Sequence, residues 1–223
     1  MKRNEFRKWL TRKIILNKNA KKVRNLFFPG SASYWEKRYQ KNGNSGNGSY
    51  GRNADYKASF INNFVSKNDI QKIIEFGCGD GNQLKHFQFP SYAGLDVSAT
   101  AIEKCRQVFK ADSTKRFFLY DQKDLLGSVK LYRADLALSL DVIFHLVEDE
   151  VFEAYMFRLF KSSSGYVIIY AWDVEGEKKF HVRHRCFTKW IQKNIPEFRL
   201  QERISCHPGD NFCDFFIYKS GQA

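Results

Sequence analysis

The chain has 223 residues, 43% of them hydrophobic and 16% aromatic, which is enough apolar surface for one well-buried domain and excludes a globally disordered chain. Its five cysteines are odd in number and lack the two-residue spacing of zinc or redox motifs, so we expect no metal site and a reducing, cytoplasmic location. The formal net charge is +13, and no apolar run approaches the roughly 20 residues that a membrane span needs.

Much of the positive charge lies in residues 1–24, which hold ten Lys or Arg and one acid. Hydrophobic residues recur there at helical spacing: Phe6, Trp9, Leu10 and Ile14. This pattern predicts a basic amphipathic helix, which suits an anionic membrane surface, a partner protein or RNA, or simply packs on its own domain. We therefore treat residues 1–30 as a basic arm and residues 31–223 as the domain that follows.

After the arm, short helices are expected at 33–41 and 54–67, on either side of the glycine-rich segment 42–51. Strand and helix patterns then alternate: strands at 70–76, 92–96, 116–120, 134–140 and 165–171, and helices from 81 or 82, at 98–109 and at 149–160. A further helix at 187–193 precedes two strands, 198–206 and 211–220, joined by a short turn. The order predicts an α/β fold with a doubly wound, mostly parallel seven-stranded sheet, an antiparallel C-terminal hairpin and N-terminal helices.

Glycines alternate directly after the first predicted strand of that sheet, in the segment IIEFGCGDGNQL (73–84). Gly77, Gly79 and Gly81 let backbone N–H groups approach a ligand closely. Asn82 stands where a dinucleotide fingerprint needs its third glycine, so a nicotinamide oxidoreductase is disfavoured. Glu75, at the end of the strand, suits a ligand with an ammonium and a sulfonium group.

This segment resembles the first motif of class I S-adenosylmethionine-dependent methyltransferases, an acid followed by x-G-x-G-x-G. The resemblance implies a Rossmann-like methyltransferase fold, with S-adenosylmethionine as cofactor and S-adenosylhomocysteine as product. It also implies that Glu75 and the backbone of Gly77, Cys78, Gly79 and Gly81 hold the methionine part of the cofactor.

Two later segments resemble further motifs of this family, each at the end of a predicted strand. In YAGLDVS, Asp96 is placed to accept hydrogen bonds from ribose hydroxyls, and Val97 follows it beside the cofactor. In FFLYDQKD, the resemblance assigns the adenine contacts to Asp121 and Gln122.

The segment LALSLDVIFHLVED (136–149) resembles the fourth motif, with Leu140 beside the cofactor and Asp141 and His145 facing the reaction centre. It lacks the Asn/Asp-Pro-Pro-aromatic pattern of enzymes that methylate adenine or glutamine nitrogens, and the chain has no Pro-Cys pair for cytosine C5 chemistry. We expect an O-methyltransferase in which His145 is the general base and Asp141 orients it. Alternatively, His145 is a capping or packing residue and Asp141 binds substrate hydroxyls.

Cationic side chains gather in HVRHRCFTKW (181–190), just beyond the fifth strand of the parallel sheet. His181, His184 and Arg185 are suited to a phosphate or carboxylate of the substrate, because Arg can bind two oxygens at once. The alternative is a solvated helix N-terminus, although cations there oppose the helix dipole.

The glycine-rich segment NGNSGNGSYG (42–51) is predicted to be a lid over the cofactor rather than an interdomain linker, since the residues before it are too few for a core. Ser49 would place a hydroxyl near the methionine carboxylate, and Tyr50 a ring near the sulfonium. Tyr34 and Trp35 are the expected anchors, and Tyr34 is also assigned to the substrate.

The pattern YW-x-x-x-Y followed by GNSG-x-GSYG resembles a bacterial methyltransferase subgroup associated with glycan and polysaccharide biosynthesis. We therefore expect O-methylation of a sugar, a phosphate-bearing glycan or another small molecule, with the arm holding the enzyme at the inner membrane surface or on a partner protein. An RNA methyltransferase that uses the basic arm is the second hypothesis. A non-catalytic cofactor-binding scaffold is the third.

Overall fold

The computed structural model describes residues 28–120, 133–176, 179–205 and 213–221, so most of the basic arm and the turn of the hairpin lie outside the described residues. One seven-stranded sheet has the order β3-β2-β1-β4-β5-β7-β6. The strands are β1 Lys72–Phe76, β2 Ser91–Asp96, β3 Lys115–Leu119, β4 Ala134–Leu140, β5 Ser163–Ala171, β6 Phe198–Ile204 and β7 Asp214–Ser220. Strands β1 to β5 pair in parallel, whereas β7 runs antiparallel to β5 and β6, which confirms the predicted fold class.

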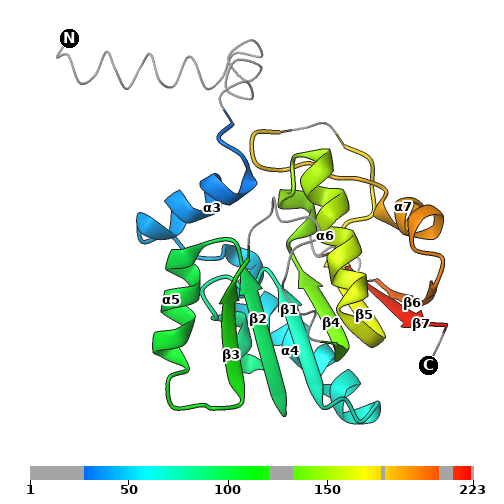
Figure 1. Cartoon of the computed structure of the whole chain (residues 1–223), viewed down its shortest axis with the longest axis horizontal. Helices are drawn as coiled ribbons and strands as arrows, with labels where there is room; N and C mark the ends of the chain where they lie inside the picture. The colour runs from blue at the N-terminus through cyan, green and yellow to red at the C-terminus, as the bar shows by residue number, and fades with distance from the viewer. Residues whose placement is uncertain (1–27, 121–132, 177–178, 206–212, 222–223) are drawn as a thin grey trace.

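Helices cover both faces of the sheet, with α6 in front of it and α4 behind it (Figure 1). The helices are α3 Ser31–Gln40, α4 Gly51–Lys67, α5 Ala99–Val108, α6 Asp149–Lys161 and α7 Phe187–Asn194, with 3-10 turns η1 Asn47–Ser49, η2 Gln83–His86 and η3 Ile143–His145. The helix expected from residue 81 or 82 is only the short turn η2. Pro90 sets a limit to any helix here, because its ring disfavours helical conformation at the residue before it. None of the described helices is long and apolar enough to cross a bilayer.

The central strand β1 is buried on both faces of the sheet. Ile73 packs in the layer with α4 and α5, whereas Ile74 and Phe76 pack in the layer with α6. Each buried side chain of this size contributes roughly 1.5–3 kcal/mol to stability. Since side chains alternate along a strand, Glu75 points into the same layer as Ile73 and its carboxylate is buried there.

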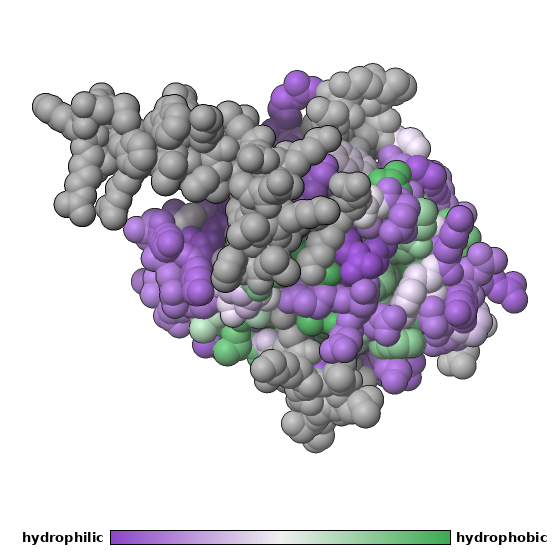
Figure 2. Space-filling model, turned by 90° about the horizontal axis from the view of Figure 1, so that it is seen from above, coloured by the Kyte–Doolittle hydropathy of each residue, from purple (hydrophilic) through white to green (hydrophobic). Residues whose placement is uncertain are grey.

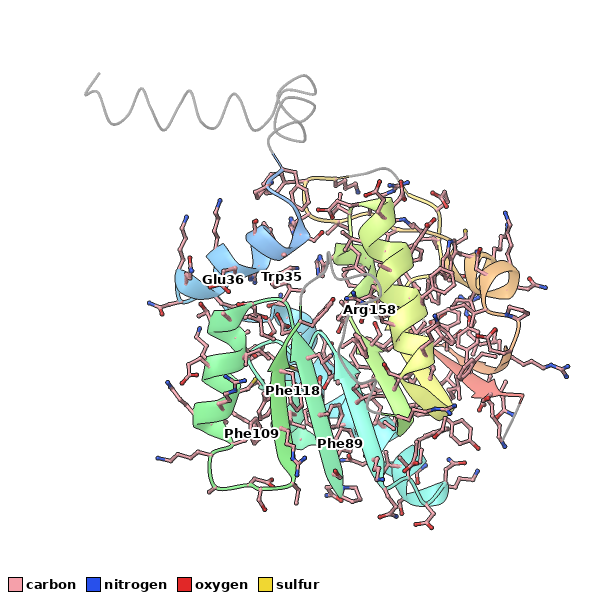
Figure 3. The ribbon with its side chains drawn as sticks, in the orientation of Figure 1. Trp35, Glu36, Phe89, Phe109, Phe118 and Arg158 are labelled. Atoms are coloured by element: carbon pink, nitrogen blue, oxygen red, sulfur yellow. The ribbon has the colours of Figure 1, made fainter. Side chains whose placement is uncertain are left out.

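Helix α3 lies across the carboxyl ends of the parallel strands, where Figure 3 labels Trp35 and Glu36. Glu36 accepts hydrogen bonds from the hydroxyls of Ser98 and Thr100, both at 2.6 Å, at the start of α5. At the other end of α3, Ser31 donates from its backbone N–H to Glu148, just before α6, at 2.9 Å. Helix α3 therefore bridges α5 and α6 over the strand ends.

Figure 2 looks onto this end of the molecule, whose described surface is mainly hydrophilic with smaller hydrophobic areas. Two pockets described below open in this region. Both are lined by loops that follow the carboxyl ends of strands, which is where open α/β sheets bind ligands.

Candidate active site

The first pocket, called the inner pocket, encloses about 570 Å³ including its open mouth. Its lining comes from α3, the glycine-rich segment and the ends of β1 to β4: Ser31, Trp35, Tyr39, Ser45, Ser49, Gly77, Gly79, Asp96, Val97, Tyr120, Leu140, Asp141, Val142, His145 and Leu146. Six of the predicted cofactor-binding residues are in this list, together with both predicted catalytic residues.

The glycine turn after β1 forms the floor of the inner pocket. Gly77 and Gly79 have φ angles of 83° and 58°, in the left-handed region that favours glycine. A Cβ atom at Gly77 would lie 2.5 Å from Val142, and one at Gly79 would lie 2.3 Å from the hydroxyl of Ser45. The turn therefore keeps bare backbone against the pocket because its neighbours leave no room for a side chain.

Two other predicted residues of this turn lie behind the inner pocket instead of lining it. Gly81 has a φ of 76° and faces Phe109 and the thiol of Cys105. The Cys78 side chain is buried, and a hydrogen bond with the neighbouring Cys105, together with burial, raises the pKa of its thiol. Both residues therefore support the turn on its side away from the pocket.

Asp96 is in the position predicted for the ribose-binding acid, at the end of β2 and in the wall of the inner pocket. Its two carboxylate oxygens accept backbone hydrogen bonds from Gly79 and Ser98, each at 2.9 Å. An ionised carboxylate has about four acceptor positions, so it can still accept from ligand hydroxyls. Burial raises the pKa of Asp96 to about 6, while these backbone bonds favour the ionised form. Asp121 and Gln122 lie outside the described residues.

Glu75 does not line the inner pocket, contrary to the direct contact with the methionine part that the motif implies. Its carboxylate is buried behind the pocket and accepts a hydrogen bond from the hydroxyl of Tyr92. Burial raises the pKa of Glu75 to about 7, against the lowering effects of Tyr92 and the ammonium of Lys57. Glu75 can therefore act on a ligand only by supporting the turn above it.

Replacing Glu75 with Gln is expected to stabilise the protein more at pH 8 than at pH 5. A carboxyl whose pKa rises from 4.5 to about 7 on folding contributes stability below pH 4.5, and this stability is lost as the pH rises through 7. Gln does not titrate, so the variant does not lose this stability. The difference in free energy of unfolding between variant and wild type should therefore shift in favour of the variant by up to about 3 kcal/mol from pH 5 to pH 8. Urea unfolding at both pH values measures it, with the exposed Glu103→Gln as control. An equal difference at both pH values would contradict the assignment.

The glycine-rich segment 42–51 lies directly over the glycine turn, held by Asp80. The carboxylate of Asp80 accepts from the backbone and hydroxyl of Ser45, at 3.0 and 2.8 Å, and from the hydroxyl of Tyr50 at 2.8 Å. Asn82 adds a bond from its side-chain amide to the carbonyl of Ser49 at 2.7 Å. Burial raises the pKa of Asp80, but these hydrogen bonds outweigh it and the pKa lies below its usual value.

This arrangement fits the predicted cover over the cofactor and corrects the role of one residue. Ser49 lines the inner pocket as predicted. Tyr50 does not, because its hydroxyl is bound to Asp80 and its ring is therefore directed to the glycine turn. Burial and Asp80 raise the pKa of the Tyr50 hydroxyl to about 12, so it stays a donor at neutral pH. Tyr50 fastens the cover instead of contacting a sulfonium.

Replacing Asp80 with Asn is expected to loosen segment 42–51. Asn offers one acceptor oxygen and places an amide donor against the donors of Ser45 and Tyr50, so at least one charge-assisted bond is lost, at a cost of about 2 kcal/mol. Limited proteolysis should cut within 42–51 roughly 30-fold faster than in the wild type. The exposed Asp55→Asn on α4 is the control. Equal cleavage rates in all three proteins would show that Asp80 does not hold the segment.

The end of β4 carries Asp141, which has a φ of 60°, a strained conformation for a residue other than glycine. Its carboxylate forms an ion pair with Lys57 of α4, with 2.6 Å between the Nζ and Oδ2 atoms. Lys57 is fully buried and its ammonium lies 5.3 Å from the ring centroid of Tyr170. The expectation that Asp141 orients His145 is therefore wrong, because this carboxylate is held by Lys57.

His145 lines the inner pocket, but its environment does not suit a general base. Its Nδ1 lies 3.0 Å from the carbonyl oxygen of His181, which only accepts hydrogen bonds, so Nδ1 carries the proton. The ring stacks on that of His181 and meets the ring of Trp35 edge-on at 4.9 Å. Burial lowers the pKa of His145 to about 4. At neutral pH it is a neutral imidazole with little capacity to take a proton, which favours the packing alternative.

A second pocket, called the outer pocket, lies on the other side of Asp141 and encloses about 690 Å³ including its mouth. It is lined by Asn47, Gly48, Asn53, Asp141, Phe144, Tyr170, Trp172, Val182, His184 and Cys213. Asp141 lines both pockets, and a Cβ atom at Gly48 would lie 2.5 Å from its carboxylate. The structure therefore places His184 in a pocket, as predicted for a substrate-binding residue.

The prediction that Arg185 binds an anionic substrate group is wrong. Its guanidinium pairs with Asp149 at 3.0 Å and donates to the carbonyl oxygens of Leu146 and Val147 at 2.7 and 3.1 Å. The same group lies over the ring of Phe152, at 4.6 Å from the centroid. These contacts use the guanidinium to fasten the loop before α6, and Arg185 lines neither pocket.

His181 and Tyr34 are stacked on each other, with ring centroids 4.6 Å apart. They form a ring column with His145 and lie beside the inner pocket without lining it. Tyr34 thus packs α3 against His181, whereas it was expected to anchor segment 42–51, and it lines neither pocket, where its predicted contact with the substrate would be formed.

Two residues of the site escaped the sequence reasoning. Lys57 occupies a helix position between the buried Ala54 and Ile61, and a lysine on the apolar side of a helix is a signal for a buried ion pair. Asp80 lies between two glycines in the motif itself, but its partner Ser45 is 35 residues away in the chain. Nothing in the local pattern around Asp80 indicates that contact.

Comparisons with known proteins agree with this geometry. Residues 74–169 match the family described as a methyltransferase domain. No curated protein matches the chain. Among solved structures, the chain is similar to the N-methyltransferase NodS from Bradyrhizobium japonicum WM9 in complex with S-adenosylhomocysteine, with a TM-score of 0.65 and 16% identity over 86% of this chain and 99% of that one.

Two further structures show the same fold. Magnesium protoporphyrin IX methyltransferase (ChlM) from Synechocystis PCC 6803, with bound S-adenosylmethionine, has a TM-score of 0.58 and 14% identity over 89% of this chain and 95% of that one. A methyltransferase from Clostridium acetobutylicum ATCC 824 has a TM-score of 0.59 and 11% identity over 85% of this chain and 97% of that one. At these identities the likeness establishes the fold and leaves the methyl acceptor open.

Proposed function

We propose that the chain is a class I S-adenosylmethionine-dependent methyltransferase that methylates a hydroxyl group of a small molecule, with a sugar or glycan unit as the favoured acceptor. S-adenosylmethionine supplies a methyl group on a sulfonium, so transfer forms a carbon–oxygen bond, leaves S-adenosylhomocysteine and releases the hydroxyl proton. The inner pocket fits this cofactor. It offers bare backbone at Gly77 and Gly79, an acid at Asp96 for ribose hydroxyls, and apolar walls at Val97 and Leu140.

The observation that carries the proposal is that Asp141 lines both pockets. An acceptor in the outer pocket would face the cofactor across this residue, and methyl transfer depends above all on such alignment. The ion pair with Lys57 fixes the carboxylate at the border of both pockets. Asp141 can then accept the hydrogen bond of an acceptor hydroxyl and orient its oxygen, which is the alternative role considered for it above.

The choice of oxygen over nitrogen needs its own test, since the similar NodS structure is described as an N-methyltransferase. The full chain is incubated with S-adenosylmethionine labelled with ¹³C in its methyl group, and with either methyl glycosides or methyl glycosides of amino sugars. We expect a new O-methyl signal in the carbon NMR spectrum of the first set, lost with Asp141→Asn. Transfer to the amino groups alone would overturn the proposal.

We further propose that residues 1–24 bring the enzyme to an anionic membrane surface from the cytoplasmic side, because their net charge is +9. Sedimentation with phosphatidylcholine vesicles, with and without phosphatidylglycerol, compares the full chain with one lacking residues 1–24. We expect binding only by the full chain and only to the anionic vesicles. If the deletion instead abolishes salt-dependent RNA binding and leaves vesicle binding unchanged, the RNA methyltransferase alternative gains support.

A further inference from the structure

The outer pocket combines aromatic rings with neutral polar groups. Trp172, directly after β5, keeps 39% of its surface exposed, and its ring centroid lies 5.3 Å from that of His184. The ring of Phe144 lies 5.6 Å from His184 on another side. These rings provide an apolar wall on which a flat or ring-shaped ligand can lie.

Hydrogen-bonding groups face the same space as the aromatic wall. Asn47, Asn53 and Asp141 come from the glycine-rich segment, from α4 and from the end of β4. The Nδ1 atom of His184 is buried and has no hydrogen-bond partner within the described residues. This nitrogen is closed to solvent, so the ring of His184 can meet a ligand hydroxyl only through the part of the side chain that lines the pocket.

Positive charge is missing from the described lining of the outer pocket. Lys57 pairs with Asp141, while Arg183 and Arg185 pair with Asp149, and Lys179 lies near His184 without being part of the lining. Burial and the nearby Lys179 lower the pKa of His184, so its ring is neutral at pH 7. An anionic ligand would meet the carboxylate of Asp141 in a described lining that holds no cation, so this pocket suits an uncharged ligand better than a phosphate or carboxylate.

We propose that the outer pocket binds an uncharged sugar ring, with an apolar C–H face of the ring on Trp172 and hydroxyls on His184, Asp141 and the two asparagines. This assignment rests on the proposed function and narrows it, because it removes the phosphate-bearing acceptor from the candidates. A sugar ring presents an apolar face and a hydroxyl edge at once, which matches the two kinds of wall in this pocket. Trp172 and His184 are then the residues that select the acceptor.

Saturation-transfer difference NMR tests this assignment on the full chain with S-adenosylhomocysteine present. The probes are the methyl glycosides of glucose, galactose, mannose and rhamnose, together with glucose 1-phosphate and p-cresol. We expect saturation of the C–H protons on one face of at least one glycoside, and none for glucose 1-phosphate. The signal should fall by at least about five-fold in Trp172→Ala and also in His184→Ala. It should persist in Phe157→Ala, a matched control whose side chain on α6 is equally exposed at 39%.

The outcomes separate this inference from the function it rests on. If S-adenosylhomocysteine binds but no glycoside is saturated, or the glycoside signal is unchanged in Trp172→Ala, the sugar assignment is wrong and the methyltransferase assignment stands. Saturation of p-cresol alone would replace the sugar by a phenolic acceptor. Failure of the protein to bind S-adenosylhomocysteine would contradict the proposed function itself. Thermal unfolding of each variant checks that a lost signal is not a lost fold.

Discussion

Replacing Gly79 with Ala is expected to lower the affinity for S-adenosylhomocysteine by at least about 100-fold. Two effects combine at this position. The φ of 58° is unfavourable for alanine, at a cost of roughly 1–3 kcal/mol. The new methyl group would also lie 2.3 Å from the hydroxyl of Ser45 and 2.9 Å from that of Tyr39, so the glycine-rich segment must move off the turn.

Gly51 provides the control that separates these two effects. Its φ of 54° is nearly that of Gly79, but a Cβ atom there would meet nothing within 4 Å. Gly51→Ala should therefore carry the backbone strain alone, with the affinity for S-adenosylhomocysteine retained. Isothermal titration calorimetry measures the affinity of both variants for S-adenosylhomocysteine. Equal losses of affinity in the two variants would mean that the close approach of Ser45 to the turn has no role in binding.

Replacing Asp141 with Asn is expected to lower the free energy of unfolding by about 3–5 kcal/mol, because it leaves the fully buried ammonium of Lys57 without its partner. Asn is the suitable substitution here, since it tolerates the φ of 60° better than other side chains do. Lys57→Met should cost less. It leaves a carboxylate that is 19% exposed at the pockets and can be solvated there.

The double variant Lys57→Met with Asp141→Asn tests whether the two residues stabilise the protein as a pair. Once the lysine charge is gone, the asparagine no longer faces an unpaired ion, so the double variant should be more stable than Asp141→Asn alone. Urea unfolding of the four proteins measures the coupling between the two sites. If the costs of the two single substitutions simply add, the ion pair does not hold the border between the pockets.

The fold could be predicted from the sequence because each strand is a short apolar run and each long helix has a clear apolar side. The ends of β1, β2 and β4 were located through Gly77, Asp96 and Asp141, since glycines and acids interrupt the apolar runs there. The direction in which a side chain points was harder to predict. Glu75 ends the strand as expected, but the alternation along β1 turns it into the core.

Contacts between distant segments were the part that the sequence could not supply. Arg185 has the chemistry of an anion binder, yet the carboxylate and carbonyl oxygens before α6 occupy its donors. A histidine in solution has a pKa that suits a general base. The burial that lowers the pKa of His145 depends on distant segments and cannot be seen in the sequence. The outer pocket is assembled from segments between residues 47 and 213, so no local pattern indicates it.

Calorimetric titration of the full chain with S-adenosylhomocysteine is the measurement that tests the account most directly. The inner pocket predicts binding of one S-adenosylhomocysteine per chain, and no heat of binding with NADH under the same conditions. Gly79→Ala should abolish the heat, whereas Gly51→Ala should preserve it. Binding of NADH with no response to S-adenosylhomocysteine would contradict the cofactor, and with it the assignment of a methyltransferase.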